Sequence, residues 1–352
     1  MEVTDFLVEL IKRGGSDLHI TVGVPPMIRK SGKLVPLEAP KLTPRDTRAL
    51  IYSILSEEQR MKLETDWEHD FAYSIPGKAR FRINVFYQRS SISAAFRLIP
   101  MEIRTLEELG MPSAVGEFCK RPRGLILVTG PTGCGKSTTC ASMIDVINGT
   151  RSGHIITIED PIEYLHKHKK SVVNQREIDT DTKSFAGALK YTLRQDPDVI
   201  LIGEMRDTET TATALTAAET GHLVLASLHT QDAPQTIDRV VDIFPPHQQQ
   251  QIRVQLAGSL QGIVSQQLLP SVRGDRVAAA EVLVVTPAVR NLVREMKTHQ
   301  IYNAMETGIK HGMHTMDQAL AALLRRGAIG RMDALDRAVD PANLKRFLNE
   351  AA

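Results

Sequence analysis

The sequence predicts an α/β fold in two domains, a small α+β domain followed by a larger domain built on a mostly parallel sheet. From residue 123 onward, short apolar runs alternate with helix-competent stretches, which is typical of parallel strands joined by crossover helices. Before residue 100, shorter alternating segments are broken by glycine and proline, which is typical of a smaller mixed domain. The length of 352 residues also exceeds the roughly 100–200 residues that one domain usually holds.

The predicted first domain covers residues 1–100. A short helix with apolar periodicity ends at Gly14-Gly15, an alternating strand follows it, and a helical pattern covers residues 43–63. The clearest strand is 80–86, whose side chains alternate between an apolar face and a face that carries arginines. Residues 93–99 are predicted to form its partner strand.

Residues 101–122 are predicted to link the domains, and residues 123–352 to form the second one. The region from about residue 247 to the end is predicted to be largely helical, with one strand-like run at 280–285. The predicted parallel strands are 125–128, 155–158, 199–202 and 223–226.

Composition excludes several classes of protein. Hydrophobic residues make up 42% and charged residues 24%, and the net charge is +2, without the basic excess of an obligate nucleic-acid binder. No apolar stretch is long enough for a spanning helix, and the first ten residues are acidic where a signal peptide would be basic, so a cytoplasmic protein without a transmembrane segment is expected. Three cysteines without C-x-x-C spacing favour neither disulfides nor zinc.

A glycine-rich loop lies between the first apolar run of the second domain and a helical segment. Its glycines let the backbone curl so that successive N–H groups face a β-phosphate, Lys136 reaches the β- and γ-phosphates, and Ser137 can bind Mg²⁺. We therefore expect ATP and Mg²⁺ as cofactors. Cys134, near a helix N-terminus, could have a lowered thiol pKa. The predicted nucleotide-binding residues are Gly130, Pro131, Thr132, Gly133, Cys134, Gly135, Lys136, Ser137 and Thr138.

Two carboxylates follow predicted strands and are candidates for catalysis. In open α/β sheets ligands lie beyond the carboxyl ends of the strands, so Glu163 and Glu204 could both reach the metal and the γ-phosphate. Gly203 stands where an aspartate is usual, so Glu204 would hold the metal through water, activate the attacking water, or do both. The alternative for Glu163 is a solvated loop carboxylate or a salt-bridge partner.

Histidines and arginines supply the remaining candidates. His222 and His229 flank the strand at 223–228, and one of them could sense the γ-phosphate; satisfied surface or core histidines are the alternative. Arg82 and Arg97 share a polar strand face and could act as arginine fingers from another domain or subunit. Solvent-facing strand arginines are the alternative.

Several motifs resemble the retraction ATPases of type IV pili, a family within the secretion and pilus-assembly P-loop ATPases. The most specific is Ala288-Val289-Arg290-Asn291-Leu292-Val293-Arg294-Glu295, which is similar to the retraction signature with conservative changes. The others are Ser16-Asp17-Leu18-His19, Arg80-Phe81-Arg82-Ile83-Asn84, Phe96-Arg97-Leu98-Ile99-Pro100, an acidic box at 156–164, a Walker B segment at 198–207, a histidine box at 222–229 and residues 312–318.

The resemblance implies a PAS-like first domain, a RecA-like second domain and a homohexamer with ATP bound between the domains. It implies a motor that powers pilus retraction and twitching motility, cytoplasmic and peripheral at the inner membrane, where it docks on the pilus platform protein (PilC-like). By matching motif, Arg82 and Arg97 are candidate fingers, and Glu163 and Glu204 are the acidic-box and Walker B glutamates. His222 and His229 are the histidine-box pair.

Two other classes of function share the predicted fold. A DNA-translocating machine would need a basic channel with aromatic side chains, whereas aromatic residues make up only 5% of this chain. A regulator that binds ATP without hydrolysing it would not need the carboxylate of Glu204. Extension and secretion ATPases of the same group carry a longer N-terminal region and a four-cysteine zinc insertion, which this sequence lacks.

Overall fold

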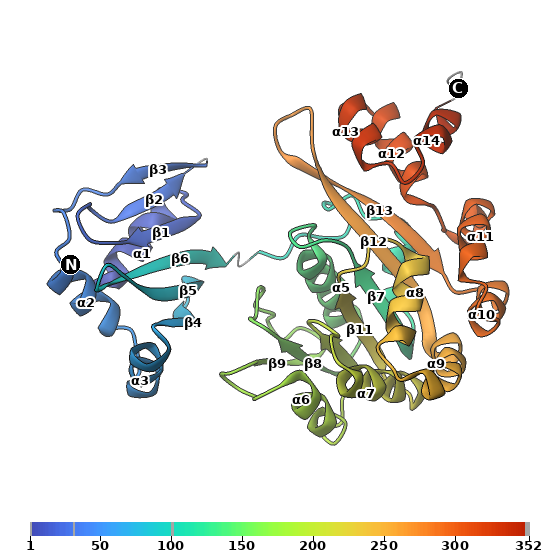
Figure 1. Cartoon of the computed structure of the whole chain (residues 1–352), viewed down its shortest axis with the longest axis horizontal. Coiled ribbons are helices and arrows are strands. Elements are labelled where there is room, and N and C mark those ends of the chain that lie inside the picture. The colour runs from blue at the N-terminus through green and yellow to red at the C-terminus, as the bar shows by residue number, and fades with distance from the viewer. Residues whose placement is uncertain (1, 31, 100–101, 349–352) are drawn as a thin grey trace. The chain divides into compact units, whose positions relative to one another are not determined.

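The computed structural model describes residues 2–30, 32–99 and 102–348. They form two compact units, each with its own hydrophobic core (Figure 1). We call Met1–Glu102 unit 1 and Ile103–Ala352 unit 2. The predicted domain boundary, at residues 100 and 101, lies outside the described residues.

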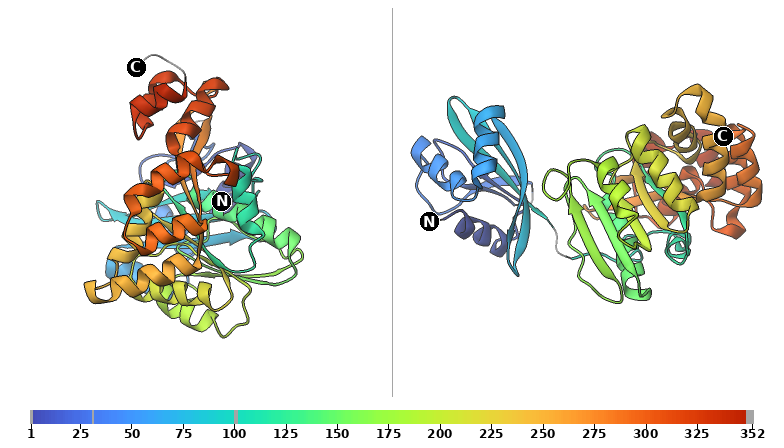
Figure 2. Two further views of the ribbon diagram at one scale, coloured as in Figure 1. Left: turned by 90° about the vertical axis from the view of Figure 1, so that its right-hand side faces the viewer. Right: turned by 90° about the horizontal axis from the view of Figure 1, so that it is seen from below.

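Unit 1 is a six-stranded antiparallel sheet whose apolar face packs against helices (Figure 2). Its strand order is β3-β2-β1-β6-β5-β4. In β5, Phe81, Ile83 and Val85 are buried in the core, as the alternating pattern predicts, and the polar residues between them point away from it. The strands are β1 (Asp17–Ile20), β2 (Met27–Lys30), β3 (Lys33–Pro36), β4 (Glu68–Ile75), β5 (Ala79–Gln88) and β6 (Ser91–Ile99), and the helices are α1 (Val3–Lys12), α2 (Pro44–Tyr52) and α3 (Glu57–Asp66).

Unit 2 is built on a seven-stranded sheet in the order β13-β12-β7-β11-β10-β8-β9. Neighbouring strands are parallel except for the antiparallel pair of β12 and β13. Each apolar run that the sequence analysis assigned to a parallel strand lies in one of β7, β8, β10 and β11. The strands are β7 (Gly124–Thr129), β8 (His154–Glu159), β9 (Val172–Glu177), β10 (Val199–Ile202), β11 (Leu223–Leu228), β12 (Leu260–Pro270) and β13 (Arg276–Val284).

Helices cover both faces of this sheet, because its central strands are apolar on both sides. In β7, Leu125 and Leu127 pack against α7, α8 and α9, whereas Ile126 and Val128 pack against α4 and α5. The helices are α4 (Ser113–Cys119), α5 (Lys136–Thr150), α6 (Phe185–Thr192), α7 (Thr208–Glu219), α8 (Ala233–Asp242), α9 (Pro246–Ser259), α10 (Pro287–Arg294), α11 (Ile301–Thr307), α12 (Met316–Arg325), α13 (Arg331–Arg337) and α14 (Pro341–Phe347), with short 3₁₀ turns at Thr298–Gln300 and Ile309–His311.

The prediction of a largely helical region after about residue 247 is wrong for β12. This strand pairs in parallel with β7 in the middle of the sheet, and β13 begins several residues earlier than the predicted run at 280–285. The polar residues of β12 hid the strand: Ser265 and Gln266 are fully or almost fully buried, yet they read as solvent-facing helix positions in the sequence. The hydroxyl of Ser265 and the amide nitrogen of Gln266 form hydrogen bonds that compensate for their burial, whereas Oε1 of Gln266 is buried without a partner among the described residues.

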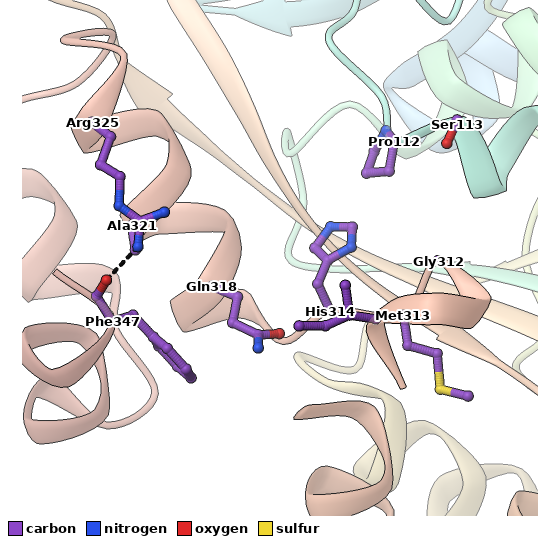
Figure 3. Close-up of a pocket in the computed structure, with 10 residues that line it drawn as sticks. Pro112, Ser113, Gly312, Met313, His314, Gln318, Ala321, Arg325 and Phe347 are labelled. Atoms are coloured by element: carbon purple, nitrogen blue, oxygen red, sulfur yellow. Dashed lines mark hydrogen bonds between the residues drawn. The ribbon is translucent and has the colours of Figure 1, made fainter. Parts of the chain in front are cut away.

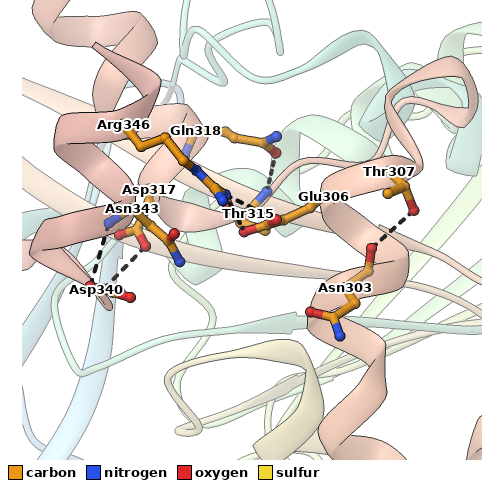
Figure 4. Close-up of polar contacts among 9 residues, drawn as sticks. All are labelled: Asn303, Glu306, Thr307, Thr315, Asp317, Gln318, Asp340, Asn343 and Arg346. Atoms are coloured by element: carbon orange, nitrogen blue, oxygen red, sulfur yellow. Dashed lines mark hydrogen bonds and ion pairs between the residues drawn. The ribbon is translucent and has the colours of Figure 1, made fainter. Parts of the chain in front are cut away.

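The last three helices, α12 to α14, pack against the sheet through a small apolar core, and polar contacts join them to one another and to α11 (Figure 4). Asp317, at the start of α12, is buried and accepts hydrogen bonds from the backbone N–H groups of Val339 (2.8 Å) and Asp340 (3.1 Å) ahead of α14. Arg346 on α14 also forms an ion pair with Glu306 on α11 (3.2 Å). The start of α12 and the segment before α14 are therefore held together by these hydrogen bonds.

A cleft of about 550 Å³ lies between the N-terminal end of α4 and the C-terminal helices (Figure 3). Pro112 and Ser113 line one side, and Gln318 and Phe347 line another part of it. None of its lining residues belongs to the glycine-rich loop, so this cleft is separate from the predicted nucleotide-binding residues.

Candidate functional site

A glycine-rich loop joins β7 to α5 at the carboxyl end of the sheet. Its backbone has positive φ angles at Gly130 (141°), Gly133 (79°) and Gly135 (93°), a conformation that residues with side chains disfavour. A Cβ atom at Gly130 would also lie 2.3 Å from the carbonyl oxygen of Gln266. A curled loop that leads into a helix N-terminus presents backbone N–H groups to an anion, so residues 130–138 fit the phosphates of a nucleotide.

The ammonium group of Lys136 is buried beneath the loop. Its Nζ donates to the carbonyl oxygens of Gly130 (2.8 Å) and Pro131 (3.2 Å) and lies 3.4 Å from Nδ1 of His229. Only 8% of the residue is exposed, and among the described residues it has no carboxylate partner. Because an unpaired buried charge is costly, phosphate oxygens are the partner that this geometry favours.

Strand β12, which the sequence analysis missed, supports the loop from below. Gln266 donates from Nε2 to the carbonyl oxygen of Cys134 (2.7 Å), and Ser265 accepts from the hydroxyl of Thr129 (2.8 Å). The expectation of a lowered thiol pKa at Cys134 is wrong, because burial raises its pKa in spite of the nearby charge of Lys136. The buried side chains of β12 therefore fix the shape of the loop.

Glu204 and His229 come together next to Lys136. The Nε2 atom of His229 lies 3.0 Å from Oε1 of Glu204, and the guanidinium of Arg206 also donates to that carboxylate. A histidine that donates from Nε2 to Glu204 can accept from Lys136 at Nδ1, so one tautomer satisfies both contacts. Burial alone would raise the pKa of Glu204, but Arg206 and His229 outweigh burial and hold that pKa below its ordinary value. Glu204 is therefore ionised.

A second carboxylate, Glu159, lies at the end of β8. Its Oε1 accepts hydrogen bonds from the hydroxyl of Thr157 (2.6 Å) and the side-chain amide of Gln175 (3.1 Å). Burial raises the pKa of Glu159 to about 7, in spite of these bonds. Glu159 belongs to the acidic box at 156–164 but is not among the predicted site residues; its position as the last residue of a buried strand was the available signal.

The acidic loop after β8 is held in place at several points. Gln175 on β9 donates to the carbonyl oxygen of Tyr164 (2.8 Å) and accepts from the backbone N–H of His166 (2.8 Å). The hydroxyl of Tyr164 in turn bonds the hydroxyl of Thr138 on α5 (2.8 Å). Glu163 lies between these contacts and is exposed. The residue after Glu163 is therefore linked to the first turn of α5, while the carboxylate of Glu163 itself is accessible.

Gly203 occupies the position where an aspartate is usual, and the packing accounts for the glycine. A Cβ atom there would lie 3.1 Å from the carbonyl oxygen of Ile158 and 3.3 Å from Cα of Glu159. A side chain at this position would therefore need the backbone at the end of β8 to move by a few tenths of an ångström, and Glu204 is the first residue after β10 that supplies a carboxylate.

His222 does not lie near the glycine-rich loop within this unit. It precedes β11, level with the start of β7, whereas His229 follows β11 at the end where the loop begins. The two histidines are therefore separated by roughly 20 Å of extended strand. The Nδ1 atom of His222 bonds the carbonyl oxygen of Ala217 (3.0 Å), a local contact at the end of α7.

The two predicted arginine fingers belong to unit 1. Arg82 on β5 and Arg97 on β6 are directly opposite each other on the exposed face of that sheet. Arg97 forms an ion pair with Asp17 (2.9 Å), and Arg82 is exposed. Their common face agrees with the alternation seen in the sequence.

The residues at the loop also suit Mg²⁺. A serine hydroxyl and a carboxylate, supplied by Ser137 and Glu204, are the hard oxygen ligands that Mg²⁺ takes together with phosphate oxygens. Within the part of the chain that the structure describes, there is no group of three or more histidine, cysteine or acidic side chains that could hold a metal by themselves. No helix among the described residues is long and apolar enough to cross a membrane.

A family model decides where this chain belongs. The model for the type II/IV secretion system proteins matches residues 3–330, which include the loop, the acidic segment and β10 to β13. The chain belongs to the type II/IV secretion system protein family. Within this family, the chain is similar to individual proteins over most of its length.

Two relatives and one solved structure cover almost the whole of this type II/IV secretion system protein. The type IV pilus retraction ATPase PilT of Pseudomonas aeruginosa is 50% identical over 343 residues, which are 97% of this chain and 100% of that protein. A twitching motility protein of Neisseria gonorrhoeae is 48% identical over 314 residues, 89% of this chain and 84% of that protein. A crystal structure of the pilus retraction motor PilT with bound ADP has a TM-score of 0.93 and 54% identity, covering 98% and 99%. The predicted resemblance to retraction ATPases and the α/β fold are confirmed.

Proposed function

We propose that this chain is a motor ATPase that powers type IV pilus retraction, and with it twitching motility. The observation that carries the proposal is the contact of Lys136, His229 and Glu204 beside a phosphate-binding loop. It occurs in a chain that resembles a pilus retraction ATPase over nearly its full length. The reaction is the hydrolysis of ATP to ADP and phosphate.

The chemistry follows from the charges of the site. Water attacks the γ-phosphorus in line with the departing ADP, and the negative charge on the γ-oxygens has to be stabilised. Lys136 supplies one fixed positive charge from beneath the loop. Bound Mg²⁺ would neutralise further charge on the phosphates, with Ser137 and Glu204 as the residues that would hold it. The ionised carboxylate of Glu204 orients the attacking water or accepts its proton.

The remaining features of the proposal concern assembly. The chain would act as a homohexamer in the cytoplasm, peripheral to the inner membrane, and dock on the platform protein of the pilus machine. Unit 1 would be a PAS-like domain and unit 2 a RecA-like domain, with ATP bound between such domains. Arg82 and Arg97 of unit 1 would complete the charge neutralisation as arginine fingers. His222, which lies at the opposite sheet edge, would then take no part within its own unit.

One experiment tests the enzymatic part of the proposal. Lys136→Ala should abolish ATP turnover, because it removes the buried cation of the phosphate site; Lys120→Ala, at the exposed end of α4, is the matched control and should leave turnover unchanged. Turnover by the Lys136 variant at the rate of the unaltered protein would refute the site.

A second experiment tests the cellular role. A strain that carries only Lys136→Ala should keep excess surface pili and lose twitching. Absence of pili in that strain would instead assign the motor to pilus extension.

A further inference from the structure

A row of charged side chains crosses the exposed face of the unit 1 sheet. In the strand register Arg29 on β2 is opposite Asp17 on β1, Asp17 is opposite Arg97 on β6, and Arg97 is opposite Arg82 on β5. Paired positions on neighbouring strands place their side chains on the same face. A single carboxylate is thus surrounded by arginines from both neighbouring strands.

Asp17 is fixed from several directions. Its Oδ1 accepts a hydrogen bond from Nε of Arg97 (2.9 Å), and its Oδ2 accepts from the hydroxyl of Ser16 (2.8 Å) and lies 3.9 Å from Nε of Arg29. Burial would raise the pKa of Asp17, but the bonds from Arg97 and Ser16 outweigh it, and its pKa lies below the ordinary value. The carboxylate is therefore ionised and held in place.

Arg97 is held at one end and exposed at the other. Its side chain is 75% exposed, whereas that of Asp17 is 11% exposed. The bond to Asp17 uses Nε, which leaves the two terminal amino groups of the guanidinium for another ligand. Those amino groups form the planar fork that matches phosphate oxygens.

The guanidinium of Arg29 makes a different contact from that of Arg97. Its Nη1 donates to the carbonyl oxygen of Gly32 (2.9 Å), so one of its two terminal amino groups is already engaged within unit 1. Of the two arginines that flank Asp17, Arg97 is the more exposed, at 75% against 39% for Arg29, and both of its terminal amino groups lack a partner among the described residues.

We propose that Asp17 is a positioning residue for the ATPase reaction: it orients the guanidinium of Arg97 so that its terminal amino groups meet the γ-phosphate. The inference rests on the proposed function, in which Arg97 is an arginine finger. A long flexible side chain loses rotamer freedom when it binds, and the bond to Asp17 removes part of that freedom beforehand. Asp17 would act through Arg97 and would not touch the nucleotide.

The test is steady-state ATPase kinetics of the full chain. Asp17→Ala should lower kcat about 10- to 100-fold, since arginine fingers contribute roughly 10³- to 10⁵-fold and misplaced ones retain part of that. The KM for ATP should change by less than about twofold, because the phosphate loop in unit 2 is unaltered. Asp17→Asn keeps an oxygen acceptor for Nε and should show an intermediate loss.

The matched control lies on the same face of the same sheet. Asp70 on β4 is exposed and accepts a hydrogen bond from Asn84 (3.2 Å), not from an arginine. Asp70→Asn should leave kcat unchanged. Equal losses for the Asp17 and Asp70 variants would overturn the inference, because they would show a general sensitivity of this face.

A double-mutant cycle separates positioning from a structural role. If Asp17 acts through Arg97, Asp17→Ala should have no further effect in an Arg97→Ala background. Equal fold losses in both backgrounds would overturn the inference. Slow turnover by Arg97→Ala together with normal turnover by Asp17→Ala would overturn the role of Asp17 alone. Normal turnover by Arg97→Ala would refute the arginine finger itself and the inference with it.

Discussion

Two neighbouring strands of the unit 2 sheet lead into a glutamate, and the two carboxylates have opposite pKa shifts. Glu204 follows β10, and its pKa is below the ordinary value because Arg206 and His229 outweigh its burial. Glu159 ends β8, and burial raises its pKa to about 7 because its hydrogen-bond donors carry no charge.

The opposite pKa shifts suit the two carboxylates to different roles in ATP hydrolysis. Strands β8 and β10 are parallel neighbours, so both carboxylates lie at the sheet edge that carries the phosphate loop. When the environment moves two pKa values apart, one group stays charged and the other can exchange a proton near neutral pH. Under the proposed function, Glu204 would then orient water and metal as a fixed charge, and Glu159 would be a second candidate for the proton acceptor.

The largest effect is expected for Glu204→Gln. The variant keeps the shape of the side chain but loses its charge, so kcat should fall roughly 10³-fold while ATP binding is retained. Glu209→Gln, at an exposed position of α7, is the control and should be neutral. Turnover and nucleotide affinity, measured separately, check the prediction. A loss smaller than about tenfold would move the catalytic role to Glu159 or Glu163.

A smaller loss, about 10²-fold in kcat, is expected for Glu159→Gln. If Glu159 accepts a proton, kcat of the unaltered protein should rise with pH around 7, where its pKa lies, because only the ionised form is a base. The Gln variant should lose this rise. A pH profile of both proteins decides the point, and a rise that persists in the variant would exclude Glu159 as its source.

Gln175→Ala tests the same pH dependence by removing a hydrogen-bond donor of Glu159. The amide of Gln175 donates to the carboxylate and so stabilises its ionised form, which lowers its pKa. Removing it should shift the rise in kcat to higher pH by up to about one unit. Asn174→Ala, the exposed neighbour on β9, is the control. A shift to lower pH would contradict the assignment of the rise to Glu159.

Much of the fold could be predicted from the periodicity of apolar residues, but strand β12 could not. The central strands are apolar on both faces and short, so they stand out as runs in the sequence. Gln266 and Ser265 interrupt such a run in β12, and only their partners, the carbonyl of Cys134 and the hydroxyl of Thr129, explain why polar side chains are buried there. Those partners lie more than 130 residues away in sequence.

The candidate site also contains residues that could be predicted from the sequence and residues that could not. Lys136 and Glu204 could be found because a loop motif and the end of a strand fix their places. The roles of Arg206 and Gln175 could not, because they depend on side-chain contacts to Glu204 and to the acidic loop. His222 and His229 look alike in the sequence, yet the direction of β11 places only His229 beside Lys136.

Glu281 is a third carboxylate with a shifted pKa, and it lies away from the phosphate loop. We therefore expect Glu281 to affect the free energy of unfolding more than the rate of ATP hydrolysis. It is completely buried on β13 and accepts hydrogen bonds from the backbone N–H groups of Ala233 (2.9 Å) and Met316 (3.2 Å), the first residues of α8 and α12. Burial raises its pKa from 4.5 to about 7. Between these pH values the folded chain binds more protons at Glu281 than the unfolded chain does, so the free energy of unfolding falls as pH rises.

Glu281→Gln cannot ionise and should lose this pH-dependent part of the free energy of unfolding, which amounts to roughly 3 kcal/mol for a pKa raised from 4.5 to about 7. Thermal unfolding between pH 5 and 7.5 should therefore show a smaller decrease in Tm for the variant than for the unaltered chain. Glu295→Gln, which replaces an exposed carboxylate at the end of α10, should leave the decrease as it is. An identical decrease in all three proteins would mean that Glu281 stays ionised, because the two helix N-termini then offset its burial completely.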